Sequence, residues 1–122
     1  LEAAGYRVLA GSVAAETVGA GGDPLDPRVI FDRDMSWIAE SDVLVAEVST
    51  PSLGVGYEIA AARYEFDVPV IALYRNAYTT RCSAMISGDP AIELLPYETV
   101  DELVPKLRES LARLPRSTPR LP

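Results

Sequence analysis

The segment from Val43 to Glu58 constrains the fold of this chain more than any other stretch. Its first four residues, VLVA, are uniformly apolar, which predicts a central parallel strand covered on both faces. The turn that follows, STPSLGVG, is rich in small residues and leads into a helix. Open α/β sheets bind ligands at the carboxyl ends of their strands, so a binding site is predicted here.

Strands and helices alternate along the rest of the chain. The patterns predict strands at 6–10, 43–46 and 68–74, an edge strand at 94–97, and helices over 26–40, 55–66 and 99–114. Asp26 and Thr99 are expected helix N-caps, whereas Pro105 should kink the last helix or delay its start. This succession predicts an α/β fold with a doubly wound, mostly parallel sheet and flanking helices.

Length and composition fit one domain. A chain of 122 residues, 48% of them hydrophobic, can bury one modest core. We expect a single domain over residues 1–114, in which the glycine-rich stretch 14–26 is a mobile loop. The proline-rich, basic tail at 115–122 is expected to be disordered.

Charge and residue usage exclude several functional classes. The net charge of -7 disfavours binding to long nucleic acids, but not to one small phosphorylated ligand held by backbone amides. One cysteine fits a reducing compartment, and no apolar run is long enough to cross a bilayer. We therefore expect a soluble, cytoplasmic protein, or a nuclear one in a eukaryote, that does not bind membranes.

The absence of histidine removes the commonest general base and the commonest metal ligand. A lone cysteine, Cys82, cannot form a thiolate zinc site and lacks a histidine to activate it as a nucleophile. We expect no metal and no cofactor. Any catalysis must use carboxylates, hydroxyls and amides.

Two carboxylates stand out on the predicted helices. Asp34 falls on the apolar stripe of its helix, one turn before Ile38, where an unpaired carboxylate would be costly. It could cap a neighbouring element or pair with an arginine such as Arg75 or Arg81. Glu58 follows the small-residue turn, where the helix dipole alone would favour an acidic residue. Both side chains can point at the mouth of the sheet.

A carboxylate pair beside an anion-binding turn suggests displacement at a sugar carbon. One carboxylate would attack the anomeric carbon or stabilise its positive charge. A second group would accept and donate protons, as in glycoside cleavage with retention. The turn would hold a phosphate. Alternatively, Gly54 and Gly56 only let the helix pack closely on the sheet, and Ser52 only caps it.

Four stretches resemble the 2'-deoxynucleoside 5'-monophosphate N-hydrolases of the nucleoside 2-deoxyribosyltransferase family: DRDMSW at 32–37, SDVLVAEV at 41–48, PSLGVGYE at 51–58 and SAMI at 83–86. The likeness runs from about residue 5 to residue 97. It implies a Rossmann-like or flavodoxin-like sheet and hydrolysis of the N-glycosidic bond to free base and 2-deoxyribose 5-phosphate. Glu58 would be the nucleophile that forms a covalent deoxyribosyl intermediate, and Asp34 the carboxylate beside the sugar.

The same resemblance implies the remaining contacts. Ser52 and Gly54 would bind the 5'-phosphate, and Ser83 would reach the phosphate of the neighbouring subunit in a homodimer, with Met85 close by. Two other functions stay open, namely a deoxyribosyltransferase that passes the sugar to a second base and a nucleotide-binding domain without catalysis. Ser52 and Ser83 favour the hydrolase, because a phosphate pocket suits monophosphates.

The chain departs from the family pattern in two places. The family's first strand, which ends in a Gly-Ser-Ile-Arg type segment, has no counterpart here, so we expect an N-terminally incomplete sheet. The strand at 6–10 would then lack its partner, and the 122 residues alone should be unstable or inactive. In addition, Ala10-Gly11-Ser12 stands where hydrolase relatives can carry a histidine, which affects the expected base preference and rate.

Overall fold

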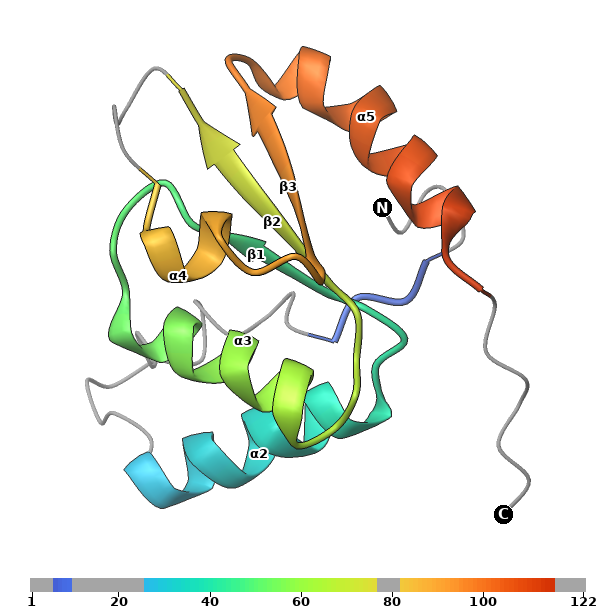
Figure 1. Cartoon of the computed structure of the whole chain (residues 1–122). Helices are drawn as coiled ribbons and strands as arrows, with labels where there is room; N and C mark the ends of the chain where they lie inside the picture. Colours follow the sequence, from blue (N-terminus) through green and yellow to red (C-terminus); the bar gives the residue numbers. More distant parts are fainter. Residues whose placement is uncertain (1–5, 10–25, 77–81, 116–122) are drawn as a thin grey trace, which may run out of the picture.

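The computed structural model describes residues 6–9, 26–76 and 82–115. Within these ranges the elements are α2 (Pro27–Glu40), β1 (Leu44–Glu47), α3 (Leu53–Tyr64), β2 (Val70–Arg75), α4 (Ala84–Ser87), β3 (Ile92–Tyr97) and α5 (Val100–Arg113). Figure 1 shows a parallel sheet with α2 and α3 on one face and α5 on the other. The α/β class with flanking helices is therefore confirmed. Most of the predicted loop at 14–26, the tail after residue 115 and the stretch 10–12 lie outside the described residues.

The sheet has three parallel strands among the described residues, in the order β1-β2-β3. Leu44 pairs with Val70 across β1 and β2, and Ala72 pairs with Leu94 across β2 and β3. The prediction that the strand at 43–46 is central is wrong for this part of the chain, since β1 is an edge and β2 lies in the middle. A uniformly apolar strand indicates that both of its faces are covered. It does not indicate whether the strand lies at the edge or in the middle of the sheet.

The predicted strand at 6–10 does not form over its described residues. Tyr6 to Leu9 have no strand conformation, and Tyr6 and Val8 are 39% and 38% exposed. A strand is defined by ladder hydrogen bonds with a neighbour, which an apolar pattern alone cannot supply. The apolar pattern at 6–10 therefore did not suffice to predict the conformation of residues 6–9.

Two apolar layers cover the faces of the sheet. Along β2, Val70 and Ala72 belong to the layer beneath α2 and α3, whereas Ile71 belongs to the layer beneath α5. This division follows from the alternation of side chains along a strand. Because α2 and α3 cover the same face of the sheet and contact each other, side chains of both helices can meet between them.

The helices begin at their predicted caps. Asp26 accepts a hydrogen bond from the Arg28 N–H at 2.8 Å, and Thr99 accepts one from the Glu102 N–H at 3.2 Å. The capped start at Thr99 places Pro105 inside α5, so the expected delay of that helix is wrong. Helix α4 was not predicted, because four residues are too few for a hydrophobic period to show.

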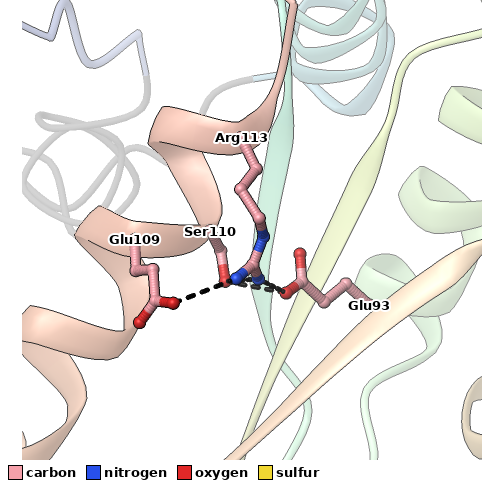
Figure 2. A network of polar contacts seen from close by, with 4 residues as sticks. All are labelled: Glu93, Glu109, Ser110 and Arg113. Carbon is pink, nitrogen blue, oxygen red and sulfur yellow. Dashed lines mark hydrogen bonds and ion pairs between the residues drawn. The ribbon is translucent and has the colours of Figure 1, made fainter.

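A polar network ties α5 to β3 (Figure 2). The buried Ser110 hydroxyl donates to Glu93 Oε1 at 2.7 Å, and Arg113 Nη2 donates to the same oxygen at 2.6 Å. Arg113 Nη1 also reaches Glu109 at 3.3 Å. The negative charge of Glu93 is thus matched by a cation and a hydroxyl, which makes this a stabilising contact between helix and sheet.

Candidate active site

The turn between β1 and α3 forms as its small residues predict. Helix α3 begins after Ser52, whose hydroxyl accepts a hydrogen bond from the Val55 N–H at 3.3 Å. This cap satisfies one of the N–H groups that a helix start leaves without an intrahelical partner. Helix starts of this kind bind anions through their remaining N–H groups.

Two glycines lie in the first turn of α3, and both are exposed. Among the described residues, a Cβ added at Gly54 would come no closer than 4.0 Å to the Ser52 Oγ, and one added at Gly56 would meet nothing within 4 Å. Close packing of α3 on the sheet therefore requires neither glycine, and that alternative is wrong. Since glycine inside a helix costs roughly 0.5 to 1 kcal/mol relative to alanine, open access to this backbone is the better explanation.

Asp34 of α2 and Glu58 of α3 meet between the two helices. Both side chains are half-buried. Burial, the negative charge of Asp34 and a hydrogen bond with its carboxyl group, in that order, raise the pKa of Glu58. The pair therefore holds a proton at pH values at which an ordinary glutamate has lost it.

Asp34 also has a cationic neighbour. Arg33 Nε lies 3.2 Å from Asp34 Oδ1, and the two side chains are only 18% and 22% exposed. The sequence suggested Arg75 or Arg81 for this contact; Arg75 donates its Nε–H to a backbone carbonyl after β3, and Arg81 lies outside the described residues. Arg33 therefore places a positive charge beside the carboxylate that contacts Glu58.

An aromatic pair also joins the same two helices. The rings of Phe31 in α2 and Tyr57 in α3 meet edge to face with centroids 6.0 Å apart. They are 42% and 59% exposed. Sequence reasoning missed this pair, because exposed aromatic residues on two separate helices give no local signal that they touch.

A hollow of about 460 Å³ lies between α3 and α4. Ser52 and Ser83 both line it, so the structure brings these two residues together within one chain, with Met85 beside them. Asp34 and Glu58 are not among its lining residues. Asp34 belongs to α2, which lies on the other side of α3 from α4 (Figure 1). Helix α3 thus lies between Asp34 and the hollow. Glu58 belongs to this helix, and its cap residue Ser52 lines the hollow.

Large apolar side chains stand open around this hollow. Leu53, Met85 and Tyr64 line it and are 96%, 82% and 80% exposed. Contiguous apolar surface of this kind usually marks a place where a ligand or another protein binds.

An ion pair that sequence reasoning missed fixes the far wall of the hollow. Arg63 near the end of α3 donates to both oxygens of Asp89, at 2.7 and 2.9 Å, and Asp89 also accepts from the Ala91 N–H at 2.9 Å. The hydrogen bond from Arg63 lowers the pKa of Asp89. This pair links α3 to the residues that follow α4. The partners are 26 residues apart, so only the fold reveals the contact.

Three further observations concern Cys82, groups of potential metal ligands and the helices of the described residues. Burial raises the pKa of the Cys82 thiol, which weakens it as a nucleophile. Within the described ranges, no group of three or more His, Cys, Asp and Glu side chains is arranged to hold a metal ion. No helix in the described part of the chain has the length and apolar character needed to cross a membrane.

Comparison with known proteins gives close relatives over most of the chain, although no family model matches. A protein of Syntrophotalea carbinolica named "Putative 2'-deoxynucleoside 5'-phosphate N-hydrolase 1" is 43% identical over 112 residues, which cover 92% of this chain and 78% of that protein. A protein of Thermofilum pendens with the same name is 43% identical over 91% of this chain and 78% of its own length. The human 5-hydroxymethyl-dUMP N-hydrolase is 42% identical over 66% of this chain and 47% of its own length.

Proposed function

The chain belongs to the 2'-deoxynucleoside 5'-phosphate N-hydrolase family, and on that premise we propose that it hydrolyses the N-glycosidic bond of 2'-deoxynucleoside 5'-monophosphates. The products would be the free base and 2-deoxyribose 5-phosphate. The observation that carries this proposal is the contact of Glu58 with Asp34, less than two helical turns after the Ser52 cap. That spacing suits a 2-deoxyribose ring held between a carboxylate and a phosphate site.

In the proposed first step, ionised Glu58 attacks the anomeric carbon. A bond forms between its carboxylate oxygen and that carbon, the bond from carbon to base nitrogen breaks, and the base leaves with the electron pair and a proton. The raised pKa of Glu58 means that its own proton must first move away. Asp34 is the acceptor in contact with Glu58, and from there the proton can pass to the leaving base.

In the proposed second step, water replaces Glu58 at the sugar. Asp34, ionised again, takes a proton from the attacking water, and the ester bond to Glu58 breaks. This exchange of acid and base roles by one carboxylate is the usual scheme for retaining glycosidases. Arg33, 3.2 Å from Asp34, would hold this carboxylate in place during the step.

We assign the 5'-phosphate to the start of α3. The Ser52 hydroxyl and the first backbone N–H groups of the helix supply donors, and the helix dipole favours the negative charge. The open space beside Gly54 supports this assignment, because a phosphate oxygen can approach the backbone there.

We further propose a homodimer with shared sites, in which Ser83 of each subunit reaches the phosphate held by the other. The exposed apolar residues Leu53, Tyr64 and Met85 around the hollow support this proposal, since a second copy would cover them. Analytical ultracentrifugation of the wild type and of Met85→Asp tests it, because a charge on that surface should shift the protein towards monomer. A cytoplasmic location is also proposed, on the basis of the single cysteine.

Product analysis tests the reaction itself. Each of the four common 2'-deoxynucleoside 5'-monophosphates is incubated with the protein, with and without a second free base. Release of base and 2-deoxyribose 5-phosphate without an acceptor is the expected result. A new nucleotide formed only with the second base would instead identify a transferase, and binding without either product would leave a nucleotide-binding domain.

Substitution of Ser52 by alanine tests the phosphate site. We expect a loss of about 1 kcal/mol in the free energy of unfolding and a KM for the monophosphate about tenfold higher, as the loss of one charge-assisted hydrogen bond predicts. Thr99→Ala is the matched control, because it removes the N-cap of α5 at a similar cost in stability. If both variants kept the wild-type KM, Ser52 would be a helix cap only.

A further inference from the structure

One carboxylate at the end of β1 joins two other parts of the chain. The Tyr97 hydroxyl donates to Glu47 Oε2 at 2.5 Å, and the Ser49 backbone N–H donates to Glu47 Oε1 at 2.7 Å. Tyr97 is the last residue of β3 and only 8% exposed, whereas Ser49 opens the turn that leads to Ser52. Glu47 therefore links the end of β3 directly to the turn that precedes α3.

The end of β2 holds the same turn. The Arg75 N–H donates to Ser49 Oγ at 2.8 Å, and the Val48 N–H donates to the Leu73 carbonyl oxygen at 2.8 Å. Both the backbone and the side chain of Ser49 are thus fixed, three residues before the N-cap of α3. Thr50 and Pro51, which connect Ser49 to Ser52, line the hollow.

These contacts have the character of a rigid support. Hydrogen bonds to an ionised carboxylate are shorter and stronger than those between neutral groups. The Glu47 hydrogen bond is the main cause that raises the pKa of Tyr97, as expected for a phenol that donates to a carboxylate. A turn held by all three strands can present Ser52 and the α3 amides in one fixed position.

We propose that Glu47 and Tyr97 are positioning residues for the phosphate-binding turn. By fixing Ser49, they would hold the Ser52 hydroxyl and the start of α3 where the substrate phosphate arrives. Neither residue would touch the substrate. This inference rests on the proposed function and adds two residues that act on the binding of the phosphate group rather than on bond cleavage.

Kinetics of Tyr97→Phe in the full chain test the proposal. The variant keeps the buried ring and removes only the hydroxyl. With a 2'-deoxynucleoside 5'-monophosphate we expect KM to rise about tenfold while kcat changes less than threefold, because one hydrogen bond to a charged acceptor is lost. With the matching unphosphorylated nucleoside, kcat/KM should stay within about twofold of the wild-type value, since that substrate gains nothing from the turn.

Two further variants separate positioning from general loss of structure. Glu47→Gln keeps one carbonyl oxygen as an acceptor and should restore part of the affinity that Glu47→Ala loses. Ser110→Ala removes a buried hydroxyl from the α5 network and should leave both KM values unchanged. Thermal unfolding shows whether each variant is folded.

The outcomes are distinct. Equal changes for both substrates in Tyr97→Phe, or no change for either, would overturn the proposal. So would a KM change of the same size in Ser110→Ala. Failure of the wild type to release base would count against the proposed function instead. In that case the positioning role is read from the Kd of 2-deoxyribose 5-phosphate, which should rise in Tyr97→Phe and not in Ser110→Ala.

Discussion

Two carboxylate clusters of this protein, one on each face of the sheet, are built in opposite ways. Between α5 and β3, Glu93 meets Arg113 and the Ser110 hydroxyl, so its charge is matched. Between α2 and α3, burial and the neighbouring carboxylate Asp34 both raise the cost of ionising Glu58, although Asp34 itself has Arg33 beside it. The first arrangement lowers the free energy of the fold, and the second raises it whenever both groups are ionised.

The difference separates a structural contact from a functional one. Packing alone would not place two half-buried carboxylates together, whereas a reaction that needs a nucleophile and a proton carrier does require them. The network of Glu93, Ser110 and Arg113 lies on the opposite face of the sheet, beneath α5. Substitutions in this network therefore serve as a reference for substitutions of Asp34 and Glu58.

Substitution of Glu58 should have the largest effect of all. Glu58→Gln keeps the shape of the side chain but cannot form the covalent bond, so kcat should fall by a factor on the order of 10³ or more. Nucleotide binding, followed by equilibrium titration, should persist because the phosphate contacts lie elsewhere. Turnover at the wild-type rate would remove Glu58 from the mechanism.

Asp34→Asn should follow with a loss of about a hundredfold in kcat, as expected when a general acid–base group is removed. Its effect on pH dependence is more specific. Without the Asp34 charge the pKa of Glu58 should fall, although not to its ordinary value, because burial is the larger cause of the increase. The acid limb of the rate profile should therefore move to lower pH, and an unmoved limb would contradict the assigned coupling.

The α5 network should respond in stability and not in chemistry. Ser110→Ala removes a buried donor to a charged acceptor and should lower the free energy of unfolding by about 1 to 3 kcal/mol. Urea denaturation measures this loss. The turnover of the folded fraction should equal that of the wild type. A loss of kcat in this variant would show that the α5 network also affects catalysis.

The smallest expected effect concerns stability as a function of pH. The folded-state pKa of Glu58 lies above its ordinary value of 4.5, so the folded chain retains a proton that the unfolded chain has already released. The contribution of Glu58 to stability is complete below about pH 4.5 and is lost as the pH rises through the folded-state pKa. Relative to the wild type, Glu58→Gln should thus gain stability between pH 4 and neutrality, in urea unfolding at several pH values. A difference in the free energy of unfolding between Glu58→Gln and the wild type that stays constant with pH would contradict this prediction.

Much of the fold could be predicted because its signals are local. Asp26, Ser52 and Thr99 cap helices through residues two or three positions away, and the apolar strands carry their pattern within a few residues. The failures concern long-range pairing. The stretch at 6–9 has a strand-like pattern without strand conformation, and β1 is an edge of the described sheet although residues 43–46 are all apolar.

The sequence by itself determined the order of the longer helices and of the strands from residue 43 onwards, and it pointed to the two carboxylates. Helical spacing placed Asp34 on an inward face, and the turn of small residues before α3 drew attention to Glu58. Only the tertiary structure decided which groups surround them. Arg63 meets Asp89 across 26 residues, and Tyr97 meets Glu47 across 50. Such contacts depend on how the strands and helices are assembled, and no short-range propensity records that assembly.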